Sequence, residues 1–262
     1  MIPFDMRVHS YASNRKADQR VVRKIIELLD VNNGAVILDV GAGTGNYSVE
    51  LNKIGYKMIA IEPSVEMSSV CTDQCVNWIN CPAEDILLPD SIADAAILIL
   101  SLHHFTDIQK AINEIHRVLR EDNILVMTFN PCVAIRKMWI FDYCPLLKKY
   151  ITDRFCDVEL LKQLLEIEFS TEYELLSFPL PSDMSDAFSA AAWKNPSQYT
   201  NPETRKAMSL FNYIDEKLFI SGIEKLKIDL KTGEWYSKYS YLLQGAEYDV
   251  GCVFLRRKIS RG

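Results

Sequence analysis

The sequence has no long apolar run and no basic leader. Its longest unbroken apolar stretch, residues 95–100, is far shorter than the about 20 residues that a membrane-spanning helix needs. Residues 1–7 do not combine a basic segment with a following apolar run, so they do not predict a secretory signal. We therefore expect a cytoplasmic protein that does not act at a membrane.

Basic residues are fewer than acidic residues. The 262 residues include 29 Lys and Arg against 35 Asp and Glu, for a net charge of −6. A protein that follows a nucleic-acid backbone usually carries an excess of basic residues. The basic residues gather only near the chain end, at Arg256, Arg257, Lys258 and Arg261, where they are typical of a solvated strand end. The composition disfavours a nucleic-acid partner.

Seven cysteines are present, an odd number at irregular spacing, which is a poor basis for a disulfide framework. Cys71, Cys75 and Cys81 lie close together in sequence, but their spacing matches no standard pair of zinc-binding hooks. We predict no metal site.

A strand followed by a glycine-rich loop dominates the first third of the chain. Residues 36–40 are apolar except for Asp39 and predict a buried strand, and Gly41, Gly43 and Gly45 follow at alternate positions. A dinucleotide-binding loop needs its third glycine at position 46, which is Asn46. This departure disfavours a dinucleotide oxidoreductase.

Two further strands end in polar residues. Residues 58–61 predict a strand that ends at Glu62, about twenty residues after the first glycine, where a carboxylate can accept both hydroxyls of a ribose. Residues 95–100 predict a strand buried on both faces, followed by Ser101, Leu102 and a pair of histidines. We predict a helix opened by a capping box of Thr106 and Gln109, and then a strand at 124–129.

These landmarks, in this order, resemble the class I S-adenosylmethionine (SAM) methyltransferases, in the small-molecule, type 11-like branch. The resemblance covers roughly residues 35–130 and includes residues 80–85 as an adenine loop, although relatives carry Gly-Asp where this chain has Cys81-Pro82. It implies SAM as cofactor, S-adenosylhomocysteine as product, and a set of cofactor-binding residues. The predicted set is Tyr11, Arg15, Asp39, Gly41, Ala42, Gly43, Gly45, Glu62, Pro63, Met67, Ala83, Glu84, Ser101 and Leu102.

Within that set the resemblance also implies individual roles. Ala83 would meet the adenine through its backbone N–H and Glu84 through its side chain, and Met67 would lie under the base or serve as a core residue. Arg15 would pair with the SAM carboxylate, and Tyr11 would close over the methyl group or the acceptor; both residues fit a surface or packing role equally well. His103 is a candidate general base, with a structural role as the alternative.

The resemblance implies an α/β fold: a Rossmann-like, seven-stranded, mostly parallel sheet with an antiparallel last strand and helices on both faces. Residues 172–178 and 248–255 predict strands six and seven, and about seventy residues separate them where relatives have a tight hairpin. We interpret part of this insertion as a helical cap. The predicted divisions are 1–34, an N-terminal flap and helix; 35–181, the SAM-binding core; 182–232, the cap; and 233–262, the closing strand region.

The predicted function is transfer of a methyl group from SAM to an O, N or C atom of a small, partly apolar molecule by in-line displacement. Aromatic residues in the insertion are expected either to line an apolar acceptor cavity or to fill the core of the cap. The alternative function is a non-catalytic domain that binds SAM and serves as a partner or regulatory subunit.

Overall fold

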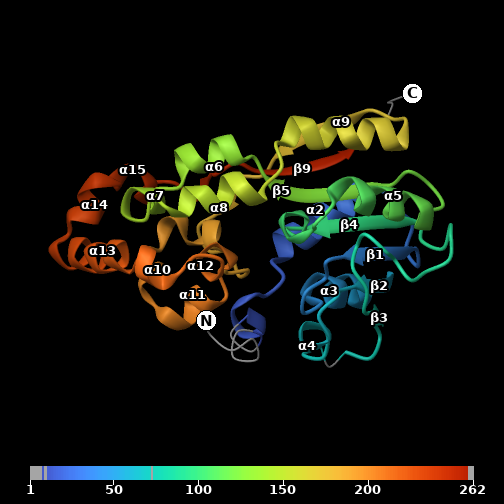
Figure 1. The fold of residues 1–262 in the computed structure, drawn as a ribbon, viewed down its shortest axis with the longest axis horizontal. Coiled ribbons are helices and arrows are strands. Elements are labelled where there is room, and N and C mark those ends of the chain that lie inside the picture. Colours follow the sequence, from blue (N-terminus) through green and yellow to red (C-terminus); the bar gives the residue numbers. More distant parts are fainter. Residues whose placement is uncertain (1–7, 9–10, 72, 259–262) are drawn as a thin grey trace. The chain divides into compact units, whose positions relative to one another are not determined.

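The computed structural model describes residues 8, 11–71 and 73–258. Residues 1–7 and Arg261, which entered the sequence analysis, lie outside them. The described residues form two compact units (Figure 1). The sheet unit comprises residues 17–129, 156–177 and 253–258, and the helical unit comprises 8, 11–16, 130–155 and 178–252. The predicted cap at 182–232 falls entirely within the helical unit, which is larger than the cap.

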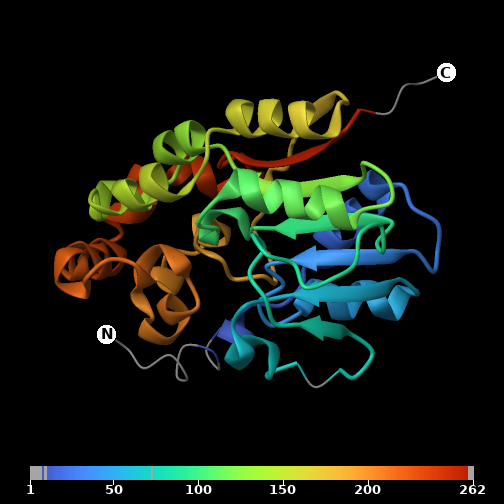
Figure 2. The same cartoon turned by 45° about the vertical axis from the view of Figure 1, so that its right-hand side comes forward.

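The sheet unit is built on a seven-stranded sheet with the order β3-β2-β1-β4-β5-β9-β6. β1 pairs in parallel with β2 and β4, β2 with β3, and β4 with β5, whereas β9 runs antiparallel to β6. Figure 2 shows the blue to green strands running side by side in one direction. The predicted fold class is confirmed. The strands are β1 (Val36–Val40), β2 (Lys57–Ile61), β3 (Asn77–Ile79), β4 (Ala95–Ile99), β5 (Ile124–Phe129), β6 (Tyr173–Ser177) and β9 (Cys252–Arg257).

The prediction for the last strand was wrong in its position. Residues 248–255 were expected to form one strand, but Glu247–Tyr248 is a separate short strand, β8, that pairs with β7 (Leu180–Pro181). Gly251 has a φ of 85°. Because this left-handed conformation breaks an extended chain, β9 begins only at Cys252.

Helices cover both faces of the sheet. On one face, Leu38, Val40 and Leu98 pack in one apolar cluster with residues of α5 (Ile108–Val118) and α9 (Val158–Phe169). Asp39 alternates with Leu38 and Val40, and its carboxylate reaches α3 (Asn46–Ile54), which therefore lies on the other face. α2 (Gln19–Leu29) packs against α3 and β5, and the short α4 (Val65–Ser68) follows β2.

The predicted start of α5 was wrong by one residue. The cap is Asp107, whose side chain accepts a hydrogen bond from the Lys110 N–H at 3.0 Å. The backbone N–H and hydroxyl of Thr106, the expected cap, both donate to Glu84. Glu84, distant in sequence, thus takes the Thr106 N–H that a capping box would have directed to the Gln109 side chain, and the Thr106 hydroxyl donates to Glu84 instead of accepting from the helix.

The helical unit consists of short helices around an aromatic core. The ring of Trp139 lies 5.1 Å from that of Trp235, 5.2 Å from Tyr199 and 5.5 Å from Tyr239. All four side chains are buried. Its α-helices are α6 (Pro131–Lys137), α7 (Ile140–Tyr143), α8 (Leu147–Arg154), α10 (Ser197–Thr200), α11 (Pro202–Lys206), α12 (Ser209–Asn212), α13 (Ile220–Thr232), α14 (Glu234–Lys238) and α15 (Ser240–Leu243), with 3₁₀ turns η2 (Ser189–Lys194) and η3 (Glu216–Leu218).

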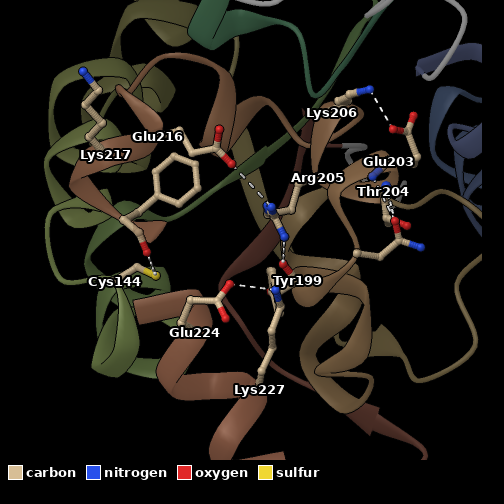
Figure 3. A network of polar contacts seen from close by, with 12 residues as sticks. Cys144, Tyr199, Glu203, Thr204, Arg205, Lys206, Glu216, Lys217, Glu224 and Lys227 are labelled. Atoms are coloured by element: carbon tan, nitrogen blue, oxygen red, sulfur yellow. Dashed lines mark hydrogen bonds and ion pairs between the residues drawn. The ribbon is translucent and has the colours of Figure 1, made fainter. Parts of the chain in front are cut away.

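A buried guanidinium organises the polar contacts of this unit (Figure 3). Arg205 donates to the Tyr199 carbonyl at 2.7 Å, and the Glu216 carboxylate lies 3.6 Å from its Nη2. Burial lowers the pKa of Arg205, against the opposing effect of Glu216. The Cys144 thiol, whose pKa burial raises to about 12, lies 3.6 Å from the Phe219 carbonyl. The Arg205 contacts join α10, α11 and η3, and the Cys144 contact joins the end of α7 to the start of α13.

None of the described helices is both long and apolar enough to span a bilayer.

Gly222 provides a test of the helical unit, because a Cβ there would lie 2.0 Å from the Tyr143 carbonyl oxygen and 2.8 Å from the Cys144 sulfur. Alanine favours a helix over glycine by up to about 1 kcal/mol, so without the clash Gly222→Ala would be stabilising. We expect it instead to lower the free energy of unfolding by about 1–3 kcal/mol, the usual cost of overpacking. Urea denaturation measures this, with Ser221→Ala as the exposed control; a gain in stability would contradict the packing.

Candidate cofactor site

The glycine loop connects β1 to α3 through three residues in the left-handed region. Gly41, Gly43 and Gly45 have φ of 75°, 60° and 76°. A Cβ at Gly41 would lie 2.5 Å from the Ser101 Cβ, so no side chain fits there. The N–H groups of Gly41 and Ala42 donate to the Ile61 carbonyl at 2.9 and 3.1 Å. The loop is thus closed against the ends of both neighbouring strands, β2 and β4.

Glu62, directly after β2, holds this loop in place. One carboxylate oxygen accepts from the Gly43 N–H at 2.9 Å and the other from the Ser64 N–H at 3.0 Å. Burial raises the pKa of Glu62, and the two backbone hydrogen bonds oppose that rise. Each oxygen has a second lone pair, so the carboxylate can still accept hydroxyl groups of a ligand.

Asp39 supplies a second carboxylate in the same region. Its side chain is buried, and it accepts a hydrogen bond of 2.6 Å from the Ser48 hydroxyl on α3. Burial raises its pKa to about 6; the Ser48 hydrogen bond lowers it, and the charge of Glu62 raises it further. A cation that approaches this pair of carboxylates lowers the electrostatic cost of ionising them.

The turn after β4 lies against the loop. The Ser101 hydroxyl donates a hydrogen bond to the Val40 carbonyl at 2.7 Å, and the Ser101 side chain packs on Gly41. Leu102 and His103 are buried in the 3₁₀ turn η1 (Leu102–His104), and the rings of His103 and His104 are 4.0 Å apart. The structure therefore brings Ser101 to the glycine loop, whereas Leu102 packs in the apolar cluster that includes Val40.

The predicted adenine loop is anchored on both sides. Asn80 donates to the Glu62 carbonyl and to the Ser68 hydroxyl, each at 2.9 Å, and Ala83 is buried. Pro63 is exposed and Met67 is half-buried, one turn into α4. Glu84 accepts hydrogen bonds from the turn that leads into α5.

Tyr11 and Arg15 belong to the helical unit. The Arg15 guanidinium forms a buried ion pair with Asp186 and lies 4.7 Å from the centre of the Tyr11 ring. A backbone bridge between Arg15 and Asp186 accompanies this pair. Asp186 is a partner that the sequence analysis did not identify, and the predicted contact of Arg15 with the SAM carboxylate stays a prediction.

Comparison of this chain with known proteins identifies its family. The family described as "Methyltransferase domain" matches residues 38–127. A crystal structure from Anabaena variabilis, of a protein provisionally described as a methyltransferase from an antibiotic biosynthesis pathway, is 37% identical and aligns with 94% of this chain and 100% of that one, with a TM-score of 0.89. The chain belongs to the class I SAM-dependent methyltransferases.

Other relatives share less of their length with this methyltransferase. Malonyl-[acyl-carrier protein] O-methyltransferase from Yersinia pestis is 27% identical over 127 residues, which is 48% of each chain. The match thus spans about half of that relative. The Haemonchus contortus phosphoethanolamine N-methyltransferase 2, solved with phosphomonomethylethanolamine and S-adenosylhomocysteine, is 12% identical over 97% of this chain and 57% of that one, at a TM-score of 0.61, and shows the shared fold.

The cofactor of this methyltransferase family is SAM, and the residues of the loop fit it. Thr44, within the glycine loop, has a buried hydroxyl oxygen that finds no hydrogen-bond partner among the described residues. Between residues 36 and 64 the only basic residues are Lys53 and Lys57, at the end of α3 and the start of β2. Two carboxylates beside the loop suit the sulfonium and ammonium groups of SAM.

Two residues that support the loop, Ser48 and Trp78, were not predicted from the sequence. Ser48 lies three residues after Gly45, and its position on α3 relative to Asp39 was the signal that could have revealed it. Trp78 on β3 packs against Gly45, where an added Cβ would lie 2.7 Å from its ring. No sequence pattern links Trp78 to the loop, because the contact depends on the strand order.

The Ser48 hydrogen bond gives a pH-dependent prediction. The pKa of Asp39 is raised by folding, so the folded state binds more protons between pH 3.8 and about 6 and stability falls as pH rises through that range. Ser48→Ala removes the donor that favours the ionised form and raises this pKa further. We expect the variant's free energy of unfolding to fall by about 1.5–3 kcal/mol at pH 8 and by less at pH 5.

Chemical denaturation at the two pH values measures this difference. Ser69→Ala is the control, because Ser69 is exposed and its hydroxyl donates to the Glu66 carbonyl at 3.0 Å, away from either carboxylate. Equal losses at both pH values would show that Ser48 does not act on the charge of Asp39.

Proposed function

We propose that this protein transfers the methyl group of SAM to an O, N or C atom of a small, partly apolar molecule. The observation that carries the proposal is the glycine loop closed by Glu62, with the buried Asp39 beside it. SAM supplies an electrophilic methyl group on a positively charged sulfur. An in-line displacement then needs little beyond an acceptor held in reach and oriented.

In this proposal the two carboxylates bind and orient. Glu62 uses its remaining lone pairs to accept ribose hydroxyls, while its bonds to the Gly43 and Ser64 N–H groups keep it from rotating. Asp39 provides negative charge at the loop, which favours a cationic ligand. Ser101 and Leu102 complete the wall on the β4 side.

His103 is the residue proposed to accept a proton from the acceptor. It lies in η1, two residues after Ser101, whose Cβ position borders Gly41. Imidazole titrates near neutral pH and suits a phenol, acid or ammonium as proton donor. The alternative is a structural role for both histidines of the turn.

The acceptor is proposed to be a small metabolite selected by the helical unit. The Anabaena variabilis relative, which shares nearly the whole length of this chain, is provisionally assigned to antibiotic biosynthesis. The net charge of −6 also disfavours a nucleic-acid acceptor. The Yersinia pestis enzyme, which is matched over 48% of its length, supports methyl transfer as the reaction class and does not define the acceptor.

The test combines binding with turnover. Thermal unfolding is measured with SAM, S-adenosylhomocysteine, NAD or buffer, because a ligand of the folded state raises the midpoint. A shift with the first two and none with NAD is expected. Release of S-adenosylhomocysteine is then followed with a panel of small phenols, acids and amines. Binding without turnover on any acceptor would favour a SAM-binding partner domain, and a shift with NAD alone would overturn the proposal.

Glu62→Ala tests the ribose contact. The variant loses a charge-assisted hydrogen bond to the ligand and the anchor of the Gly43 N–H, so we expect SAM to bind about 1–3 kcal/mol more weakly. Isothermal titration calorimetry measures the change. Glu121→Ala, an exposed carboxylate in the turn before β5, is the control. Unchanged affinity in Glu62→Ala would remove Glu62 from the site.

A further inference from the structure

Glu84 is the point at which two loops of the sheet unit are joined. One oxygen of its carboxylate, Oε1, accepts from the Thr106 N–H at 2.6 Å, the Thr106 hydroxyl at 2.9 Å and the Asp107 N–H at 3.1 Å. Glu84 follows β3, and Thr106 precedes α5. The carboxylate therefore fixes the loop after one strand to the turn after another.

The charge of Glu84 suits this role. Burial pushes the pKa of its carboxyl up, but the hydrogen bonds from Asp107 and Thr106 outweigh this effect and hold the pKa below its ordinary value. The carboxylate also lies beside the N-terminus of the eleven-residue helix α5, where the helix dipole favours a negative charge. The ionised form is therefore the one that joins the loops.

The turn between β4 and α5 is consequently held at both ends. At its start, Ser101 donates to the Val40 carbonyl at 2.7 Å. At its end, Thr106 and Asp107 donate to Glu84. The 3₁₀ turn that carries His103 and His104 lies between these two anchors.

We propose that Glu84 is a positioning residue for the Leu102–His104 turn and takes no part in recognising the adenine base. Hydrogen bonds from Thr106 and Asp107 fix the position of its carboxylate. Other groups of the site recognise the base. The proposal rests on the proposed methyl transfer only for its kinetic readout.

The first experiment measures base recognition in Glu84→Ala. Calorimetry compares S-adenosylhomocysteine with S-inosylhomocysteine, in which a carbonyl replaces the exocyclic amine of the base. We expect the ratio of the two affinities to stay within about twofold of the wild-type ratio. A tenfold fall in the ratio would show that Glu84 contacts the amine and would overturn the proposal. Asp85→Ala, the exposed neighbouring carboxylate, is the matched control.

The second experiment measures the turn itself. The chain has four histidines, so the imidazole signals in a ¹H–¹⁵N NMR spectrum can be assigned. In Glu84→Ala we expect the His103 and His104 signals to move while those of His116 stay, because His116 is held at the other end of α5 by Glu168 at 2.8 Å. Glu84→Gln, which keeps an acceptor oxygen, should move them less. Unmoved His103 and His104 signals in Glu84→Ala would overturn the proposal.

Kinetic measurements distinguish the positioning role of Glu84 from the proposed methyl transfer. With an acceptor found, Glu84→Ala should lower kcat severalfold and leave the KM for SAM within about twofold; a raised KM with unchanged kcat would contradict the positioning role. Thr106→Val, which removes one of the three donors, should also lower kcat. When Glu84 is already replaced by Ala, adding Thr106→Val should lower kcat by a smaller factor than it does in the wild-type protein. If the wild-type protein turns over no acceptor, the proposed function fails while the calorimetric and NMR experiments still decide the role of Glu84.

Discussion

The candidate cofactor site depends on two carboxylates that share a poorly solvated region and accept hydrogen bonds from neutral donors. Asp39 is compensated by the Ser48 hydroxyl, and Glu62 by two backbone N–H groups. Burial raises the pKa of both groups, and the charge of Glu62 raises the pKa of Asp39 further. A loop that must keep these carboxylates close gains stability when a cation approaches them. The loop is therefore electrostatically suited to a positively charged cofactor.

The same constraint explains the residues around the loop. Because Glu62 must reach the Gly43 N–H, the loop has to bend back over the end of β2, which needs left-handed conformations at three glycines. The bend leaves no space beside Gly41 or Gly45, and Ser101 and Trp78 fill the positions against them. Side chains from β3 and from the turn after β4 thus support a loop that follows β1.

The sequence was sufficient for the features that depend on local pattern. The apolar residues of β1 and β4, the glycine spacing and Glu62 all lie where a strand or a tight turn requires those residue types. It was insufficient where distant residues meet. Asp186 lies 171 positions from Arg15, and Glu84 takes the donors of Thr106 from 22 positions away. The helices of the helical unit were also hard to predict, since several span only four or five residues and show no helical period.

The division into two units has a consequence for acceptor choice. The residues that match the methyltransferase family, 38–127, all lie in the sheet unit, whereas the Anabaena variabilis relative also aligns with the helical unit. In the helical unit, the rings of Trp235, Tyr199 and Tyr239 lie 5.1–5.5 Å from that of Trp139, and all four side chains are buried. These four side chains fill the core of the unit. If the helical unit selects the acceptor as proposed, selection belongs to residues that it exposes, and those residues can change without loss of its core.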